Sequence, residues 1–553
     1  MREVGRVLGT DDAHPLEFWV GVAEGCYLQL DDIVCVSTPV PGREEPVTIY
    51  GVVDMVRTRY EGARFDSDVF RAAEGVLPVG IATAAHVLVT RVEPEVLVPP
   101  TPGQPVYRAT GQERERALYF DGMARRFPAG LSRDGEVVWG NLEFLDGTRG
   151  AHVNIAGISG VATKTSYALY LLYSLFHHPQ ARSSVTNARA VIFNVKGEDL
   201  LFVDRPNNRL SDEQRERYER LGLPAGPFQD VALWAPPNKN TFELVHSVGT
   251  RQDGITAYAW SLREFCQRQL LPFLFAEADS ETSQLSFAVT VAARHLREET
   301  EGQPPDRPWV MLGDRRATRF DDLVDYLAER SNDLLVGHAH LTRGTADAFL
   351  RRLQASTDAV GHLIRGDLSP EQERRHCIDV LGRQLNVIDI NKLNDRAKRF
   401  VVGVVLKQIM EQKDLQGTRE PLLFVVLDEL NKYAPREGWS PIKEVVLDIA
   451  ERGRSLGVIL IGAQQTASEV ERRVVANASF RVTGRLDVAE ATRSEYGFLV
   501  GLTRERAAIL KPGSMFLHQP EIPVPLLVNF PFPAWATRPE EVAVDREKIW
   551  DLR

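Results

Sequence analysis

The chain has 553 residues, and its 66 basic and 76 acidic side chains give a formal charge of −10. This balance excludes a protein that is coated in positive charge for binding nucleic acid over its whole surface, but it is compatible with a local basic channel. With 43% hydrophobic and 26% charged residues, the composition is that of a soluble globular protein of roughly two to four domains.

The charges are unevenly distributed along the chain. Residues 1–105 contain 16 acidic residues and 8 arginines, so nearly all of the net negative charge lies in the N-terminal fifth. Lysine is scarce, with 11 lysines against 55 arginines, and the first lysine is Lys164. The four cysteines form no CxxC pair, which argues against a disulfide framework or a zinc site. We find no apolar stretch long enough to span a membrane and no signal-peptide pattern, and we therefore expect a cytoplasmic protein without a membrane anchor.

Residues 1–98 consist of short runs of β-type residues that are separated by Gly, Pro and Asp, which favours a small closed β-barrel. The segment 98–105, VPPTPGQP, is typical of a semi-rigid linker. We therefore predict a barrel domain at 1–98, followed by a Pro-rich linker and lead-in at 99–148.

After residue 148 the pattern changes to strands that alternate with helices, which predicts an α/β core. Continuous apolar runs predict buried parallel strands at His152–Ala156, Ala190–Val195, Val231–Trp234, Leu385–Ile390, Leu422–Leu427 and Gly457–Ile461. Between 241 and 380 the pattern is mostly helical, for example over 256–275 and 320–335. We predict a core in two parts, 149–240 and 381–535, which a helical insertion at 241–380 interrupts, and a C-terminal arm at 536–553.

A candidate phosphate-binding loop lies in HVNIAGISGVATKTSYALY, where an apolar strand and a small-residue loop lead into a helix. A helix start presents backbone N–H groups to an anion, a lysine reaches the terminal phosphates and a hydroxyl holds magnesium, and Lys164 and Thr165 would fill the last two roles. The spacing is not standard, because six residues separate Gly157 from Lys164 and Thr163 precedes the lysine. A Gly-rich turn without a ligand is the alternative interpretation.

Two further segments carry groups that suit nucleotide hydrolysis. The apolar strand PLLFVVL ends in Asp428 and Glu429, which could orient magnesium through water and polarise the attacking water. The later strand VILIG precedes Gln464, a polar group suited to sensing the γ-phosphate, and Arg454 lies just before this strand.

In combination these motifs resemble those of the HerA branch of the HerA/FtsK ATPases, which are hexameric RecA-like motors that translocate duplex DNA. The similar segments are LQLDDIVCVSTPV and IYGVVDMV in the barrel, NVKGEDL at 194–200, NVIDINKLNDRAKRFVVGVVL at 386–406, LDELNKYAP, and GRSLGVILIGAQQ. The loop GISGVATKT departs from the family pattern, and Asn194 stands where the family has Asp, so that ATP turnover is expected to be slow or dependent on assembly or a partner.

The resemblance implies a RecA-like P-loop ATPase fold, ATP and Mg²⁺ as cofactors, and a specific set of site residues. The phosphate loop would comprise Gly157, Gly160, Thr163, Lys164, Thr165 and Ser166, and Thr165 and Asp428 would bind magnesium. Glu429 would be the catalytic carboxylate and Gln464 the sensor. Arg454 would act in cis, and Arg149 would act in trans on a neighbouring subunit.

The resemblance further implies a homo-hexamer that moves double-stranded DNA through its ring and works with a separate effector. Such an effector would be a NurA-like nuclease, another nuclease or a sirtuin-like NADase, it would dock on the acidic barrel, and the setting would be DNA-end processing or antiviral defence. The alternative is a ring-forming scaffold that oligomerises and activates an effector, with ATP in a structural or regulatory role.

Overall fold

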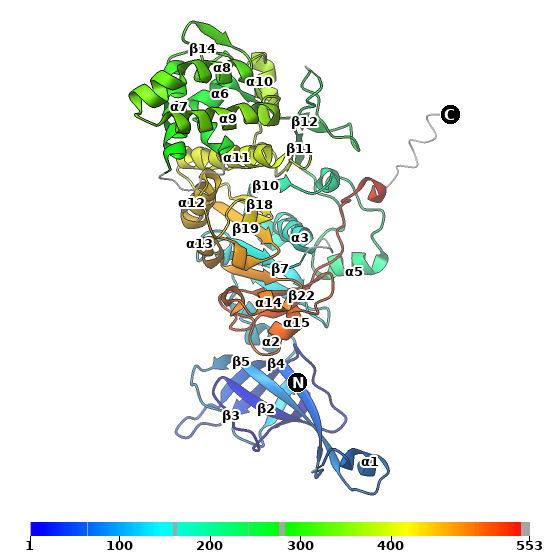
Figure 1. Ribbon diagram of the computed structural model, residues 1–553. Helices are drawn as coiled ribbons and strands as arrows, with labels where there is room; N and C mark the ends of the chain where they lie inside the picture. The colour runs from blue at the N-terminus through cyan, green and yellow to red at the C-terminus, as the bar shows by residue number, and fades with distance from the viewer. Residues whose placement is uncertain (1, 64, 159–162, 242, 276–282, 543–553) are drawn as a thin grey trace, which may run out of the picture. The chain divides into compact units, whose positions relative to one another are not determined.

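The computed structural model describes residues 2–63, 65–158, 163–241, 243–275 and 283–542 (Figure 1). The chain forms two compact units. One contains the residues up to 142 together with 480–530, and the other contains residues 143–479 together with those from 531 onward. No helix in the described part of the chain is both long and apolar enough to cross a lipid bilayer.

Six antiparallel strands of the first unit close into a barrel in the order β1-β2-β5-β4-β3-β6. Alternate side chains fill the interior, for example Phe18 and Val20 on β2 and Val34 and Val36 on β3. The predicted N-terminal barrel is therefore confirmed. The strands are β1 Glu3–Val7, β2 Glu17–Val22, β3 Ile33–Thr38, β4 Val47–Glu61, β5 Gly80–Glu93 and β6 Pro105–Arg108, and helix α1 Asp68–Ala73 joins β4 to β5.

The barrel extends beyond the predicted boundary at residue 98, because β6 starts at Pro105 and pairs with both β1 and β3. A proline is tolerated at the first residue of a strand, where its missing N–H removes little from the ladder. The region 99–148 is thus not mainly a linker. It contributes β6 to the barrel and also forms α2 Gln112–Ala117, β7 Arg126–Leu131 and β8 Val137–Asn141.

The first unit also contains antiparallel strands in the order β20-β21-β22-β7-β8. Their C-terminal members come from residues 480–530, which we had predicted to belong to the α/β core. The additional elements here are β20 Phe480–Thr483, α14 Val488–Ala491, α15 Thr503–Ala507, β21 Ser514–His518 and β22 Leu526–Asn529.

In the second unit, parallel strands lie side by side in the order β12-β11-β17-β10-β18-β19-β9. All six apolar runs that we predicted as buried strands are present, so the α/β class is confirmed. One strand, β19, separates β18 from β9. The strands are β9 Val153–Ala156, β10 Arg189–Asn194, β11 Val231–Ala235, β12 Ile255–Ala257, β17 Leu385–Asp389, β18 Leu423–Asp428 and β19 Val458–Gln464.

Helices pack beside this sheet (Figure 1), and local capping sets their ends. Asn394 caps the start of α11 by accepting a hydrogen bond from the Ala397 N–H. Gly457 ends α12 at a φ of +74°, where a Cβ atom would lie 1.9 Å from the Arg419 carbonyl oxygen. The helices are α3 Thr163–His177, α4 Pro179–Ser184, α5 Asp212–Arg220, α11 Asp395–Gln416, α12 Pro441–Leu456 and α13 Arg472–Ala476.

The predicted helical insertion is present next to α11, and Trp260 and Phe265 pack against Phe400 of that helix. The first part of 256–275 was wrongly predicted as helix: residues 255–257 form β12 of the sheet, and the helix begins only after Ser261, which caps it. The elements are β13 Trp260–Ser261, α6 Leu262–Gln267, α7 Gln284–Thr300, β14 Val310–Leu312, β15 Arg315–Ala317, α8 Phe320–Ser331, α9 Arg343–Val360, β16 Ile364–Arg365 and α10 Pro370–His376.

The predicted C-terminal arm is described only up to residue 542. Just before it, Trp535 is buried against Tyr173 of α3 and against Phe228, with ring centroids 4.9 Å apart in both pairs. The stretch 531–542 therefore packs on the second unit by aromatic contacts. Residues 543–553 lie outside the described part.

Candidate active site

The candidate phosphate loop connects β9 to α3, and its two ends are described. Gly157 follows β9, and its N–H donates to the backbone oxygen of Gln464 at 3.1 Å. Helix α3 begins at Thr163, and Ser166 lies partly exposed in its first turn. Residues 159–162, and with them the predicted site residue Gly160, lie outside the described residues, as does the side chain of Thr163.

Lys164 and Thr165 stand at the start of α3 and have different hydrogen-bond partners. Lys164 is buried, with 5% of its surface exposed, and its Nζ donates to the Gly157 carbonyl oxygen at 2.6 Å. Burial lowers the pKa of Lys164, while the nearby Asp428 partly opposes this shift. Thr165 Oγ1 donates to Asp428 Oδ2 at 3.1 Å. This hydrogen bond joins the loop to the end of β18, although the two residues are 263 positions apart.

The acidic pair stands at the carboxyl end of β18 with an unusual backbone. Asp428 is the last residue of the strand, and Glu429 adopts the left-handed conformation with φ of +56° and ψ of +48°. This region is sparsely populated for residues other than glycine. The Glu429 N–H donates to Asp428 Oδ1 at 2.9 Å, so the turn presents both carboxylates at the same edge of the sheet.

Two lysines neutralise this pair. Lys196 Nζ lies 3.4 Å from Asp428 Oδ2 and 3.1 Å from Glu429 Oε1, and Lys432 Nζ lies 2.6 Å from Glu429 Oε2. Burial alone would raise the pKa of Glu429, but Lys432 and Lys196 outweigh it and lower the pKa. For Lys196, burial would lower the pKa, but Asp428 and Glu429 together raise it. The sequence analysis assigned neither lysine to the site, although the position of Lys196 within NVKGEDL was a signal for it.

Gln464 ends β19, between the two strands that carry the other groups. It is fully buried, and its Nε2 donates to Asn154 Oδ1 of β9 at 2.9 Å. Its Oε1 has no hydrogen-bond partner within the described residues. A buried amide oxygen without a donor is costly, so this atom suits a ligand or a water that supplies one.

Arg454 and Arg149 lie at the opposite edge of the parallel sheet, where β19 and β9 begin. Arg454 precedes β19, and its guanidinium donates to the carbonyl oxygens of Gly147 and Thr148 at 3.1 and 2.8 Å, in the loop before β9. Arg149 belongs to the same loop and stacks on Phe144. β19 separates this edge from Gln464 by about 20 Å, a distance that does not favour the cis role predicted for Arg454, and this role stays a prediction.

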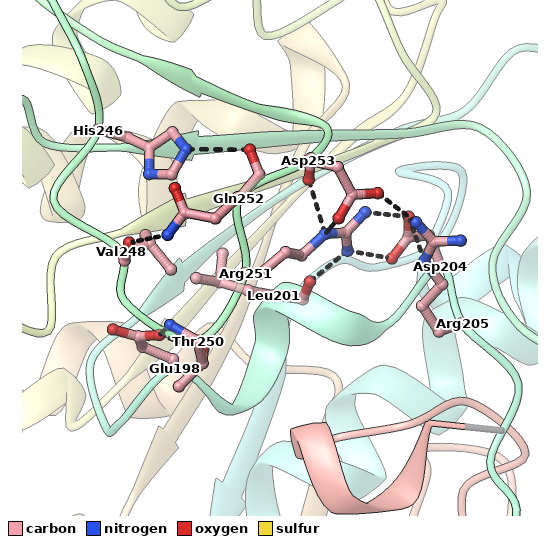
Figure 2. A network of polar contacts seen from close by, with 10 residues as sticks. All are labelled: Glu198, Leu201, Asp204, Arg205, His246, Val248, Thr250, Arg251, Gln252 and Asp253. Atoms are coloured by element: carbon pink, nitrogen blue, oxygen red, sulfur yellow. Dashed lines mark hydrogen bonds and ion pairs between the residues drawn. The ribbon is translucent and has the colours of Figure 1, made fainter. Parts of the chain in front are cut away.

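The segment 194–200 is held from several sides. Asn194 Nδ2 donates to the Gly197 carbonyl oxygen and to Asp389 Oδ1, both at 2.8 Å. Glu198 pairs with Lys392 Nζ at 2.7 Å and accepts from the Thr250 N–H at 2.9 Å, the second of which Figure 2 shows. These partners outweigh burial and lower the pKa of Glu198 to about 2.

The neighbouring loop is fixed by a buried arginine (Figure 2). Arg251 makes a two-pronged ion pair with Asp204 at 2.6 and 2.8 Å and also donates to the Leu201 carbonyl oxygen. Such a forked pair has a defined geometry. The loop that contacts Glu198 is therefore a fixed support for the 194–200 segment.

The residues present fit a magnesium-bound nucleotide. A lysine and a hydroxyl stand at a helix start, a carboxylate contacts that hydroxyl, and Oε1 of Gln464, which has no partner among the described residues, lies on the neighbouring strand. Hydroxyl and carboxylate oxygens are hard ligands of the kind that Mg²⁺ prefers.

The sequence matches no known family profile and no curated protein. Among solved structures, it is similar to the unbound bacterial conjugative coupling protein TrwB lacking its first 70 residues, with a TM-score of 0.46 and 14% identity over 79% of this chain and 95% of that chain. It is also similar to VirB4 of Thermoanaerobacter pseudethanolicus, with a TM-score of 0.43 and 15% identity over 77% and 98% of the two chains. TrwB in complex with ADP and Mg²⁺ gives a TM-score of 0.40 and 14% identity over 71% and 88%. Similarity at this level carries no argument about function, so the resemblance to HerA stays a prediction.

Proposed function

We propose that this chain is an ATPase of the HerA/FtsK kind that binds a magnesium-bound nucleotide at the carboxyl edge of its parallel sheet and hydrolyses ATP. The observation that carries the proposal is the hydrogen bond between Thr165 and Asp428, which brings a lysine–hydroxyl helix start to an acidic strand end. A turn without a ligand would have no need for this pairing of groups.

The proposed roles follow from the position of each group. Lys164 contacts the terminal phosphates, within a loop that includes Gly157, Gly160, Thr163 and Ser166. Thr165 and Asp428 hold magnesium, which supplies charge neutralisation for phosphoryl transfer when it is bound. Glu429 orients and polarises the attacking water, and the Oε1 of Gln464 accepts a hydrogen bond from that water and so senses the terminal phosphate.

We place both arginines in trans. Since Arg454 and Arg149 lie at the edge opposite the phosphate loop, they can contribute to phosphoryl transfer only at the site of a neighbouring subunit. This placement supports the proposed homo-hexamer, in which closed symmetry would place this edge against a neighbour's phosphate edge. In the proposed ring, duplex DNA passes through the centre.

We further propose that the acidic barrel docks a separate effector protein, a nuclease or a sirtuin-like NADase, in DNA-end processing or antiviral defence. The support is the charge distribution, because an acidic surface repels DNA and suits a protein partner. The scaffold function remains the second candidate, and it is favoured by the two lysines that already neutralise the acidic pair without a nucleotide.

Substitution of the two central residues tests the ATPase. Glu429→Gln should lower DNA-stimulated ATP hydrolysis by about 10²-fold or more while ATP binding persists, and Lys164→Ala should weaken ATP binding itself. The exposed residues Glu437 and Lys511 provide the controls Glu437→Gln and Lys511→Ala. If both site variants hydrolyse ATP like the wild type, the ATPase proposal is wrong. If hydrolysis is lost but the effector stays active, the scaffold function is favoured.

A further inference from the structure

Lys196 contacts both members of the acidic pair in a chain that is rich in arginine and poor in lysine. The chain has 11 lysines and 55 arginines, yet four lysines lie at this one edge, namely Lys164, Lys196, Lys392 and Lys432. Lys196 Nζ is 3.4 Å from Asp428 Oδ2 and 3.1 Å from Glu429 Oε1. Thr165 donates to the same oxygen of Asp428. The ammonium therefore occupies a position between the two carboxylates.

The backbone fixes this position. Gly197 adopts a φ of +59°, its N–H donates to Asn391 Oδ1 at 3.0 Å, and its carbonyl oxygen accepts from Asn194 Nδ2. Glu198 is held by Lys392 and by the loop at 249–250. Because the residues on the C-terminal side of Lys196 are anchored in this way, its contact with the acidic pair is part of the fold and not a chance encounter of a free side chain.

We propose that Lys196 is the internal counter-ion of the acidic pair and competes with the divalent cation for Asp428. The proposal rests on the proposed function, because it concerns the metal requirement of the same site. The side chains of Asp428 and Glu429 are only 7% and 14% exposed, so two uncompensated negative charges there would be costly. Lys196 compensates for them when no divalent cation is bound, and a doubly charged ion must displace its ammonium to reach Asp428 Oδ2.

The chemistry of the side chain suits this exchange. An ammonium is a compact, strongly hydrated point charge on a flexible stem, whereas a guanidinium would form a two-pronged pair that is harder to break. The Lys196 side chain is 51% exposed, so it can turn into water when a metal arrives. Lys432 offers a matched comparison, since its side chain is 52% exposed and pairs with Glu429 alone.

The test measures metal binding on the full chain without nucleotide. Mn²⁺ is titrated into wild type, Lys196→Met and Lys432→Met, and the free ion is followed by electron paramagnetic resonance. Removing one positive charge from both carboxylates should tighten Mn²⁺ binding by about tenfold in Lys196→Met, with a smaller change in Lys432→Met. Lys196→Met should also melt at a lower temperature than wild type in EDTA and regain this loss when Mn²⁺ is added.

The proposal is overturned if Lys196→Met and the wild type bind Mn²⁺ with equal affinity, or if neither binds it. It is also overturned if Lys432→Met gains as much Mn²⁺ affinity as Lys196→Met. Lys196→Gln is the second variant if the methionine variant fails to fold. ATP hydrolysis by the wild type is measured in parallel. If the wild type hydrolyses ATP but Lys196→Met binds Mn²⁺ no more tightly, only the counter-ion proposal is rejected. If Lys196→Met binds Mn²⁺ more tightly but the wild type does not hydrolyse ATP, the counter-ion proposal is supported and only the ATPase proposal is rejected.

Discussion

Asp389 should make the stability of the second unit depend on pH. It ends β17, is fully buried, and has one carboxylate oxygen that is paired within the described residues. Oδ1 accepts from Asn194 Nδ2 at 2.8 Å and from the Asn391 N–H at 3.4 Å, whereas Oδ2 has no hydrogen-bond partner in the described part of the chain. Burial, which the hydrogen bond from Asn194 only partly opposes, raises the pKa of Asp389 from 3.8 to about 6.

The sign of the effect follows from proton binding. Between pH 3.8 and about 6 the folded chain keeps a proton on Asp389 that the unfolded chain has lost, so the free energy of unfolding falls as the pH rises through this window. A difference of about two pKa units corresponds to about 3 kcal/mol. Glu198 works in the opposite sense, because its pKa of about 2 gives stability that is lost as the pH falls, mostly below this window.

The variant Asp389→Asn removes the titrating group and should remove this fall in stability. The assay is urea unfolding of wild type and Asp389→Asn at a series of pH values between about 4 and 8, with the difference between the two curves as the readout. That difference should shift in favour of the variant by about 3 kcal/mol across the window. The control is Asp314→Asn, an exposed carboxylate in the β14–β15 turn. A difference that stays flat with pH would refute the reasoning.

Two further predictions concern backbone geometry and assembly. Gly457→Ala should destabilise the chain by about 3 kcal/mol or more, because a Cβ would lie 1.9 Å from the Arg419 carbonyl oxygen. Gly417→Ala is the control, since Gly417 has a similar φ of +60° but open space around it, and this variant should cost only about 1 kcal/mol. Both values are measured by thermal or urea unfolding. Arg454→Ala and Glu429→Gln should each abolish ATP hydrolysis. Mixing the two proteins should restore part of the hydrolysis, because some subunit interfaces then combine an intact arginine with an intact carboxylate. If the hydrolysis assay shows no recovery in the mixture, action of Arg454 in trans is contradicted.

The elements that sequence reasoning found are those that local composition determines. The strands of the core are continuous apolar runs, and the acidic pair follows one of them directly, so their position needed no tertiary information. The errors occurred where pairing overrides local preference. Pro105 starts a barrel strand because β6 pairs with both β1 and β3, and residues 255–257 form an edge strand of the sheet although the longer segment 256–275 suggests a helix.

The sequence alone could not predict which side chains contact each other across the sheet edge. The contact of Lys196 with Asp428 spans 232 positions, and the hydrogen bond of Gln464 with Asn154 spans 310. The position of Arg454 is different, since chain direction alone shows at which end of its strand it lies. Arg454 precedes its strand and Gln464 ends it, and in a parallel sheet these positions lie at opposite edges.

This separation of the two edges has a consequence for how the proposed enzyme is regulated. The lysines, the hydroxyl and the carboxylates meet at the carboxyl edge, and Arg454 and Arg149 lie at the other. In the proposed mechanism, the lysines of a single chain balance the negative charges of this edge, and its two arginines lie at the opposite edge. The divalent cation and a neighbouring subunit would both have to change this arrangement before phosphoryl transfer, so we expect hydrolysis by an isolated chain to be slow and turnover to depend on assembly of the proposed ring.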